Sequence, residues 1–120
     1  MSKVYGYCRT ARAEKVAIIK QIELVENYCK AKDIKLSCCF CDDGVSAHDL
    51  NRSSFGKLIE TLNEGDVVVM KDISRLARDP QKLNTLTAKI REAGAEIEYI
   101  NYATDKSLEI EAWLRSKLKV

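Results

Sequence analysis

Four arginines in this sequence combine a residue type and a spacing that suit phosphate chemistry. Arg75 and Arg78 lie three positions apart, so in a helical turn they would share one face and point at one ligand. The planar guanidinium group pairs with two phosphate oxygens at once and keeps its charge. Together with Arg9 and Arg52, and with Asp42 orienting one of them, this pair could stabilise an in-line displacement at phosphorus without a metal ion. The alternative is four surface arginines that each pair with a carboxylate.

The charge of the chain is concentrated in two stretches. The 120 residues carry a net charge of only +2, but residues 1–20 hold five cations and one acid, and residues 71–91 hold six cations and two acids. The remainder is therefore acidic. If the fold brings the two basic stretches together, the protein has one basic face suited to nucleic-acid phosphates. If it does not, these charges are ordinary solvated helix surface.

The hydrophobic pattern predicts the elements that must position these residues. Apolar and β-branched runs predict strands, and apolar spacings of three and four predict amphipathic helices. Parallel strands need helical crossovers, so the alternation predicts an α/β fold with an open, mainly parallel β-sheet flanked by helices. Active sites in such sheets lie beyond the carboxyl ends of the strands. Strands are expected at about 3–8, 35–41, 66–70 and 95–101, and helices at about 13–31, 53–62, 80–93 and 107–118.

Polar residues and glycines mark where these helices begin and end. Ser53 or Ser54 is expected to cap the second helix, and Gly65 suits the left-handed position after it. Asp79 followed by Pro80 is typical of a cap and a first-turn proline, so the third helix should begin there. The loop between the second strand and the second helix should then contain the acidic stretch that begins at Asp42.

Composition and motifs exclude several classes of protein. The length fits one domain, and no apolar run approaches the roughly 18 residues of a membrane span. Five cysteines are a poor disulfide framework, so free thiols and a cytoplasmic location without a signal peptide are expected. The only CxxC, Cys38 to Cys41, has no second pair, so no metal or cofactor is expected. A pocket for a cation at Asp42 and Asp43 is a further reading, which needs a third carboxylate.

Three segments in order give the sequence a family resemblance. They are Tyr7-Cys8-Arg9, the loop 40–47 followed by 51–55, and the run 65–79 with its Ser74-Arg75-Leu76-Ala77-Arg78 core. Over about residues 3–101 the chain resembles the catalytic domain of the serine site-specific recombinases, the resolvase/invertase family. The resemblance implies that a serine attacks a DNA phosphodiester, that a 5′-phosphoserine link forms, and that subunits of a synaptic tetramer exchange strands without metal or cofactor. Homodimers that assemble into tetramers on DNA are the implied partners.

The resemblance also assigns roles to individual positions. It implies that Arg9 is the motif arginine after the first strand and that Arg75 and Arg78 clamp the scissile phosphate. Arg52 and Asp42 would support the site, and Gln21 is a weaker match. The implied DNA contacts are Arg9, Arg12, Lys71, Arg75 and Arg78.

The position of the family's nucleophile holds alanine in this sequence. The motif reads Arg9-Thr10-Ala11, and a methyl group cannot attack phosphorus, so the chain as written is expected not to cleave DNA. Three explanations stay open: an engineered serine-to-alanine change, a naturally inactive relative, or use of Thr10. The last requires a side chain one step along a strand end, which points the other way. Ser74 is a second departure, because many relatives have aspartate there.

The length is the third departure from the family. We expect residues 1–120 to form one resolvase-type catalytic domain in which 105–120 is a short C-terminal helix, with no separate DNA-binding domain in this chain. Remaining DNA affinity would then be weak, nonspecific and sensitive to salt. A noncatalytic DNA-binding or oligomerisation module of the same fold is the alternative function.

Overall fold

The fold was analysed in a computed structural model that describes residues 2–101. The helix expected at 107–118, and with it the C-terminal segment 105–120, lies outside the described residues. Within the described part, no helix is both long and apolar enough to cross a membrane. The same residues contain no group of three or more His, Cys, Asp or Glu side chains that could hold a metal ion. All five cysteines are free thiols, as expected.

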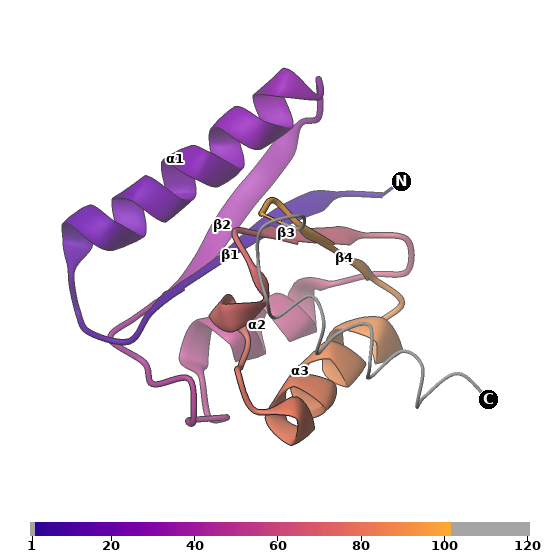
Figure 1. Ribbon diagram of the computed structural model, residues 1–120. Helices are drawn as coiled ribbons and strands as arrows, with labels where there is room; N and C mark the ends of the chain where they lie inside the picture. Colours follow the sequence, from indigo (N-terminus) through magenta and orange to yellow (C-terminus); the bar gives the residue numbers. More distant parts are fainter. Residues whose placement is uncertain (1, 102–120) are drawn as a thin grey trace.

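Four parallel strands form one sheet in the order β2-β1-β3-β4 (Figure 1). Helices connect successive strands, which is the crossover that parallel pairing requires. The predicted α/β fold with a parallel sheet is therefore confirmed. The strands are β1 (Val4–Thr10), β2 (Leu36–Asp43), β3 (Val67–Met70) and β4 (Glu96–Tyr99). The helices are α1 (Lys15–Ala31), α2 (Ser53–Thr61), α3 (Pro80–Glu92) and the short 3-10 helix η1 (Ile73–Arg75).

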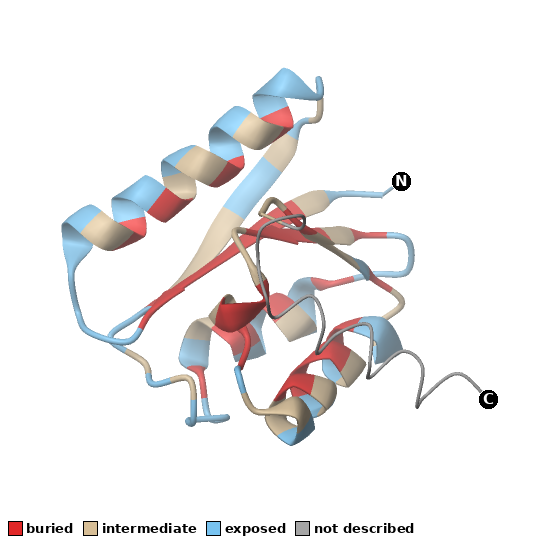
Figure 2. Cartoon of the chain, viewed as in Figure 1, coloured by how far each residue is buried: buried red, intermediate tan, exposed pale blue. Residues whose placement is uncertain are grey.

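The helices cover both faces of the sheet, which gives three layers and two apolar cores. Helix α1 packs on one face, where Val25 and Cys29 meet Cys8 and Val69 of the central strands. Helices α2 and α3 pack on the other face in a larger core that contains Phe55 and the fully buried aliphatic residues of α3. Buried residues accordingly follow the central strands β1 and β3 and the inner sides of the helices (Figure 2). Packing on both faces fixes the positions of the carboxyl ends of β1 and β3.

The two strands that carry site residues are longer than the pattern predicted. Strand β1 continues to Thr10 and β2 continues to Asp43, so Arg9 and Asp42 lie within paired strands and not in the loops after them. Their Cα atoms are partners in the β1–β2 register. The hydrophobic pattern missed these strand ends because they carry polar side chains. Each of these side chains is bound by atoms of another element.

The predicted helix boundaries are confirmed in part. The side chain of Asp79 accepts from the backbone N–H of Gln81 at 3.3 Å, with Pro80 in the first turn of α3. Gly65 has a φ of +90°, the left-handed conformation that the sequence predicted for it. The expected serine cap of α2 is wrong, because Arg52 occupies the N-cap position and its side chain does not cap the helix. A carboxylate from β2 takes that role, as described below.

We expect Gly6→Ala to destabilise the protein by about 1–3 kcal/mol, because an added methyl group overfills a packed core. A Cβ at this position would lie 2.5 Å from the Cys39 sulfur and 2.9 Å from Val25 Cγ1, both packed between β1, β2 and α1. Urea unfolding monitored by circular dichroism measures the change. The matched control is Gly56→Ala in α2, where nothing lies within 4 Å. That variant should be more stable by up to about 1 kcal/mol, since alanine is the better helix former. Equal effects of the two variants would contradict the packing argument.

Candidate active site

Arg9 is a buried arginine whose side chain binds backbone carbonyl groups. Only 3% of the residue is exposed. Its Nε donates to the Arg75 carbonyl at 2.8 Å, Nη2 donates to the Ser74 carbonyl at 2.7 Å, and Nη1 donates to the Val45 carbonyl at 2.6 Å. Burial, together with the charges of Arg52 and Arg75, lowers the pKa of Arg9 to about 10. Arg9 is still a cation at neutral pH, and it joins the end of β1 to η1 and to the loop after β2.

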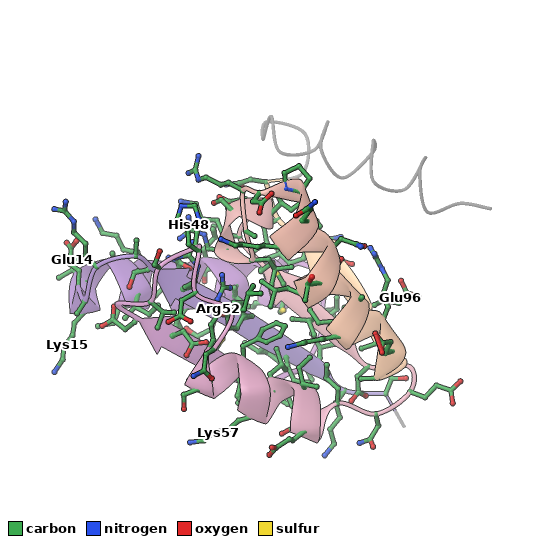
Figure 3. The ribbon with its side chains drawn as sticks, turned by 90° about the horizontal axis from the view of Figure 1, so that it is seen from below. Glu14, Lys15, His48, Arg52, Lys57 and Glu96 are labelled. Atoms are coloured by element: carbon green, nitrogen blue, oxygen red, sulfur yellow. The ribbon has the colours of Figure 1, made fainter. Side chains whose placement is uncertain are left out.

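Arg52 is buried in the same way and reaches the same segment. It is 3% exposed, and Figure 3 shows it near the middle of the face that carries α2 and α3, whereas Lys57 projects outward. Its Nη1 donates to the Arg75 carbonyl at 3.1 Å, and its Nη2 donates to the Leu76 carbonyl. Further donations run to the Asp49 and Ala47 carbonyls of its own loop. Two guanidinium groups thus converge on one peptide of η1.

The guanidinium group of Arg75 is less buried and has the most varied partners. Nη1 donates to the Arg9 carbonyl at 2.6 Å, so the two arginines bind each other's main chain. Nε lies 3.3 Å from the Asp72 carboxylate, and Nη2 donates to the Ser74 hydroxyl at 2.9 Å. The exposed fraction of its side chain is 17%. Arg75 is therefore held on one side and open on the other.

Asp42 connects three elements through its carboxylate. It accepts from the backbone N–H groups of Ser54 at 2.9 Å and Phe55 at 3.0 Å, and so caps α2 from a neighbouring strand. It also accepts from the Tyr7 hydroxyl at 2.9 Å, beside which lies Nη1 of Arg52. Burial raises the pKa of Tyr7, so that phenol stays protonated and donates. The carboxylate supports the site and does not line its pocket.

Asp43 points to the opposite side of β2, as neighbouring strand residues do. It accepts from the Thr10 hydroxyl and from the Glu14 backbone N–H, and these bonds hold the pKa of its carboxyl below the usual range. The Thr10 oxygen in turn accepts from the Gly44 N–H at 3.2 Å. The two carboxylates therefore face different partners, and the pocket for a cation at Asp42 and Asp43 is wrong.

Gln21 fastens α1 to the end of β1. Its amide oxygen accepts from the Arg9 N–H at 3.1 Å, and its amide nitrogen donates to the Arg9 carbonyl at 2.9 Å. This pairing continues the hydrogen bonding of the strand with a side chain. Gln21 is 7% exposed and turns its outer atoms toward a cavity.

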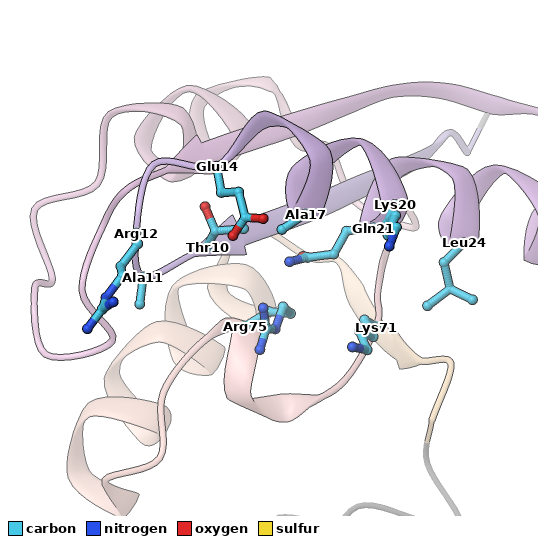
Figure 4. Close-up of a pocket in the computed structure, with 10 residues that line it drawn as sticks. All are labelled: Thr10, Ala11, Arg12, Glu14, Ala17, Lys20, Gln21, Leu24, Lys71 and Arg75. Atoms are coloured by element: carbon cyan, nitrogen blue, oxygen red, sulfur yellow. The ribbon is translucent and has the colours of Figure 1, made fainter.

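A basic pocket of about 530 Å³ opens beside Ala11 (Figure 4). It lies between the start of α1 and the segment that follows β3, at the carboxyl ends of the strands, as expected for a parallel sheet. Among the described residues that line it, Glu14 is the one carboxylate. The cations in this described lining come from both basic stretches of the sequence: Arg12, Lys20, Lys71 and Arg75. The two stretches thus meet at one site.

The sequence-predicted residues do not all lie in this pocket. Arg75 and Ala11 line it, while Arg9 is buried behind Arg75. Arg78 is exposed and is not among the described residues that line the pocket. Lys20 was missed as a site residue, although it belongs to the basic stretch at 1–20. Of the four candidate arginines, Arg75 alone is among the described residues that line the pocket, while the side chains of Arg9 and Arg52 bind carbonyl groups of the protein.

Comparison with known proteins identifies the family. The family description "Resolvase, N terminal domain" matches residues 4–115. The chain belongs to the resolvase family of serine recombinases. This resolvase domain is 30% identical over 93 residues to a resolvase of Clostridium perfringens, which covers 78% of the chain and 46% of that protein. A resolvase/recombinase of Pseudomonas putida is 27% identical over 99 residues, 82% of the chain and 51% of that protein. The chain spans about half the length of the curated relatives it matches.

Solved structures show the same fold. The N-terminal catalytic domain of TP901-1 integrase superposes with a TM-score of 0.74 at 21% identity, covering 96% of this chain and 90% of that one. A serine recombinase from Sulfolobus solfataricus superposes with a TM-score of 0.70 at 28% identity, covering 99% of this chain and 81% of that one. The resolvase domain therefore has the fold of serine recombinase catalytic domains.

We expect Asp42→Ala to destabilise the resolvase domain by about 2–4 kcal/mol, because it removes a helix cap and leaves the Tyr7 hydroxyl without its acceptor. Urea unfolding measures the loss. Asp49→Ala is the matched control, since Asp49 is exposed and its side chain accepts only from the nearby Asn51 N–H among the described contacts. That variant should change stability by less than about 1 kcal/mol. A loss for Asp42→Ala no larger than for Asp49→Ala would show that the carboxylate does not connect the three elements.

Proposed function

We propose that this resolvase domain holds a DNA phosphate in the basic pocket beside Ala11 and that, as written, it does not cleave the strand. The observation that carries the proposal is that Arg75, Lys71 and Arg12 line the same pocket as Ala11. The family resemblance implies that position 11 is the place of the nucleophile. In the active form of such a site, the serine hydroxyl oxygen attacks phosphorus and the 3′ oxygen leaves. A methyl group has no electron pair to attack with.

Three classes of residue perform different parts of the proposed task. Arg75, Lys71 and Arg12 attract and neutralise phosphate oxygens. Arg9 and Arg52 hold the main chain from which Arg75 projects, through the carbonyl groups of η1. Arg78, which is exposed next to this segment, would contact phosphates outside the pocket. The pocket contacts are electrostatic and independent of base sequence, so binding should be weak and sensitive to salt.

Use of Thr10 as a substitute nucleophile has less support than an inactive site. Its hydroxyl already donates to Asp43 and accepts from the Gly44 N–H, and only 7% of the residue is exposed. Attack on phosphorus would break both bonds and reverse the side-chain direction. Geometric displacement of even about 1 Å is costly for an in-line reaction.

A noncatalytic module for DNA binding or self-association is the second candidate. It is favoured by Arg9 and Arg52, whose side chains are satisfied by the protein itself, so the scaffold needs no ligand to be stable. By analogy with the family, we propose homodimers that form tetramers on DNA, in the cytoplasm. We further propose that residues 1–120 form one catalytic domain.

Ala11→Ser should restore covalent attachment to DNA. The expected product is a 5′-phosphoserine adduct, detected as a protein–DNA band resistant to denaturation and mapped to residue 11 by mass spectrometry. The unchanged chain should give no such band. In the Ala11→Ser background, Arg75→Ala should slow adduct formation by roughly 100-fold or more, since it removes a charge that stabilises the transition state.

Other results of that experiment separate the two candidate functions. No adduct with Ala11→Ser, in a protein whose circular dichroism and unfolding curve are unchanged, would overturn the cleavage mechanism and favour the noncatalytic module. An adduct at Thr10 in the unchanged chain would overturn the proposed inactivity.

The salt dependence of DNA binding should report the phosphate contacts. Arg75→Ala and Lys71→Ala should each weaken binding to a short duplex and reduce the slope of log affinity against log salt by about one. Fluorescence anisotropy at several salt concentrations measures the slope. The control is Lys57→Ala, an exposed cation that projects from α2 and does not line the pocket (Figure 3). Equal slopes for all three variants would place the DNA elsewhere.

A further inference from the structure

The carboxylate of Asp72 collects three donors from the segment that follows β3. Its Oδ1 accepts from the Ser74 backbone N–H at 3.1 Å, from the Ser74 hydroxyl, and from Arg75 Nε at 3.3 Å. The side chain of Asp72 is 14% exposed, so the group is largely shielded from water. Among the described residues, Asp72 is the one ion-pair partner of Arg75, which lines the basic pocket.

The Ser74 hydroxyl forms a second path between the same two charges. A hydroxyl has one hydrogen, and here it is donated to Asp72. The oxygen is thereby left to accept from Arg75 Nη2 at 2.9 Å. Hydrogen bonds in such a chain polarise and strengthen one another. Only 5% of Ser74 is exposed, so water does not compete effectively for these contacts.

These contacts fix the plane of the Arg75 guanidinium group. Of its five N–H bonds, one on Nε, one on Nη1 and one on Nη2 are directed at Asp72, the Arg9 carbonyl and Ser74. A planar group held by three acceptors cannot rotate without breaking one of them. The two remaining N–H bonds have no acceptor among the described contacts, and Arg75 itself lines the pocket.

We infer that Asp72 is a positioning residue for Arg75, and that it acts both by direct contact and through the Ser74 hydroxyl to aim the free guanidinium edge at a bound phosphate. The inference rests on the proposed function for the identity of the ligand, while the orientation of Arg75 is a property of the protein alone. Asp72 itself is not among the described residues that line the pocket.

A purely electrostatic view of Asp72 predicts the opposite effect on DNA binding. A carboxylate near a phosphate site repels the ligand, so removing its charge should strengthen binding. If Asp72 positions Arg75, the same removal should weaken binding, because the guanidinium group is no longer held. The sign of the change therefore distinguishes positioning from simple charge.

The first test is duplex binding by the chain as it exists, with Asp72→Asn. We expect affinity to fall about threefold to tenfold, the effect of losing a charge-assisted hydrogen bond at a phosphate contact. Glu14→Gln is the matched control, because it removes one negative charge from the same pocket and Glu14 is not among the described hydrogen-bond or ion-pair partners of Arg75. This control should bind up to about twofold more tightly. Tighter binding by Asp72→Asn as well would overturn the inference.

A second test separates the relay through Ser74 from a general loss of structure. Ser74→Ala removes the hydroxyl and Ser74→Thr retains it, so only the alanine variant should weaken binding. Combining Ser74→Ala with Asp72→Asn should cost little more than the worse single variant, since both act on one relay. Additive losses would show two independent effects and contradict the relay.

Nuclear magnetic resonance tests the orientation of Arg75 without any ligand. In Asp72→Asn, the Arg75 Nε–H signal should shift and its hydrogen exchange should accelerate about tenfold, while the Arg9 Nε–H signal stays in place. Arg9 Nε donates to the Arg75 carbonyl, so it reports any displacement of the loop itself. An unchanged Arg75 signal, or equal changes at both arginines, would overturn the inference.

These readouts keep the inference separate from the proposed function. Failure of Ala11→Ser to form an adduct would count against cleavage and leave the Arg75 measurements valid. If the Arg75 Nε–H signal does not change in Asp72→Asn while Ala11→Ser still forms the adduct, only the role of Asp72 is contradicted.

Discussion

The site depends on two buried guanidinium groups that must find acceptors inside the protein. A buried cation without hydrogen-bond partners is strongly unfavourable, so Arg9 and Arg52 fix the position of whatever carbonyl groups they reach. Those groups belong to Ser74, Arg75 and Leu76, in and directly after η1. A short 3-10 helix has little stability of its own. Here the free carbonyl groups of η1 are the acceptors that Arg9 and Arg52 need, so the short helix and the two buried arginines stabilise each other.

The arginines therefore fall into two groups. Arg9 and Arg52 support the main chain, and Arg75 is the one proposed to contact the phosphate. The main chain of Arg75 is held by two arginines, and its side chain is held by Asp72, Ser74 and the Arg9 carbonyl. Such restraint suits a group that must meet a charge developing in a transition state, because a preorganised cation requires no rearrangement when the charge appears. The other cations of the described pocket lining are Arg12 before α1, Lys20 on α1 and Lys71 after β3. Under the proposed function they attract the phosphate, whereas Arg75 contacts it in a fixed orientation.

The sequence predicted the fold well and the site less well, for a physical reason. Hydrophobic period, the valine run of β3 and the Asp79-Pro80 start of α3 are local signals, and local signals determine elements. The acceptors of Arg9 lie 36 to 66 positions away in the sequence, so its burial could not be inferred from its neighbours. The cap of α2 failed for the same reason, because Asp42 reaches it from a strand. Residue types suggested phosphate chemistry, but only the structure separates buried arginines from exposed ones.

The alanine at position 11 is compatible with this architecture because the supporting network does not use it. Arg9 and Thr10, just before it, are bound through Gln21, Asp43 and the carbonyl groups near η1, while Ala11 is exposed at the pocket wall. A nucleophile at that point would face the pocket and would carry none of the contacts that hold β1, α1 and η1 together. Under the proposed function, alanine at this position would lack an attacking oxygen without removing a structural contact. The proposed binding of phosphate and the proposed cleavage of DNA would then depend on different atoms of the site.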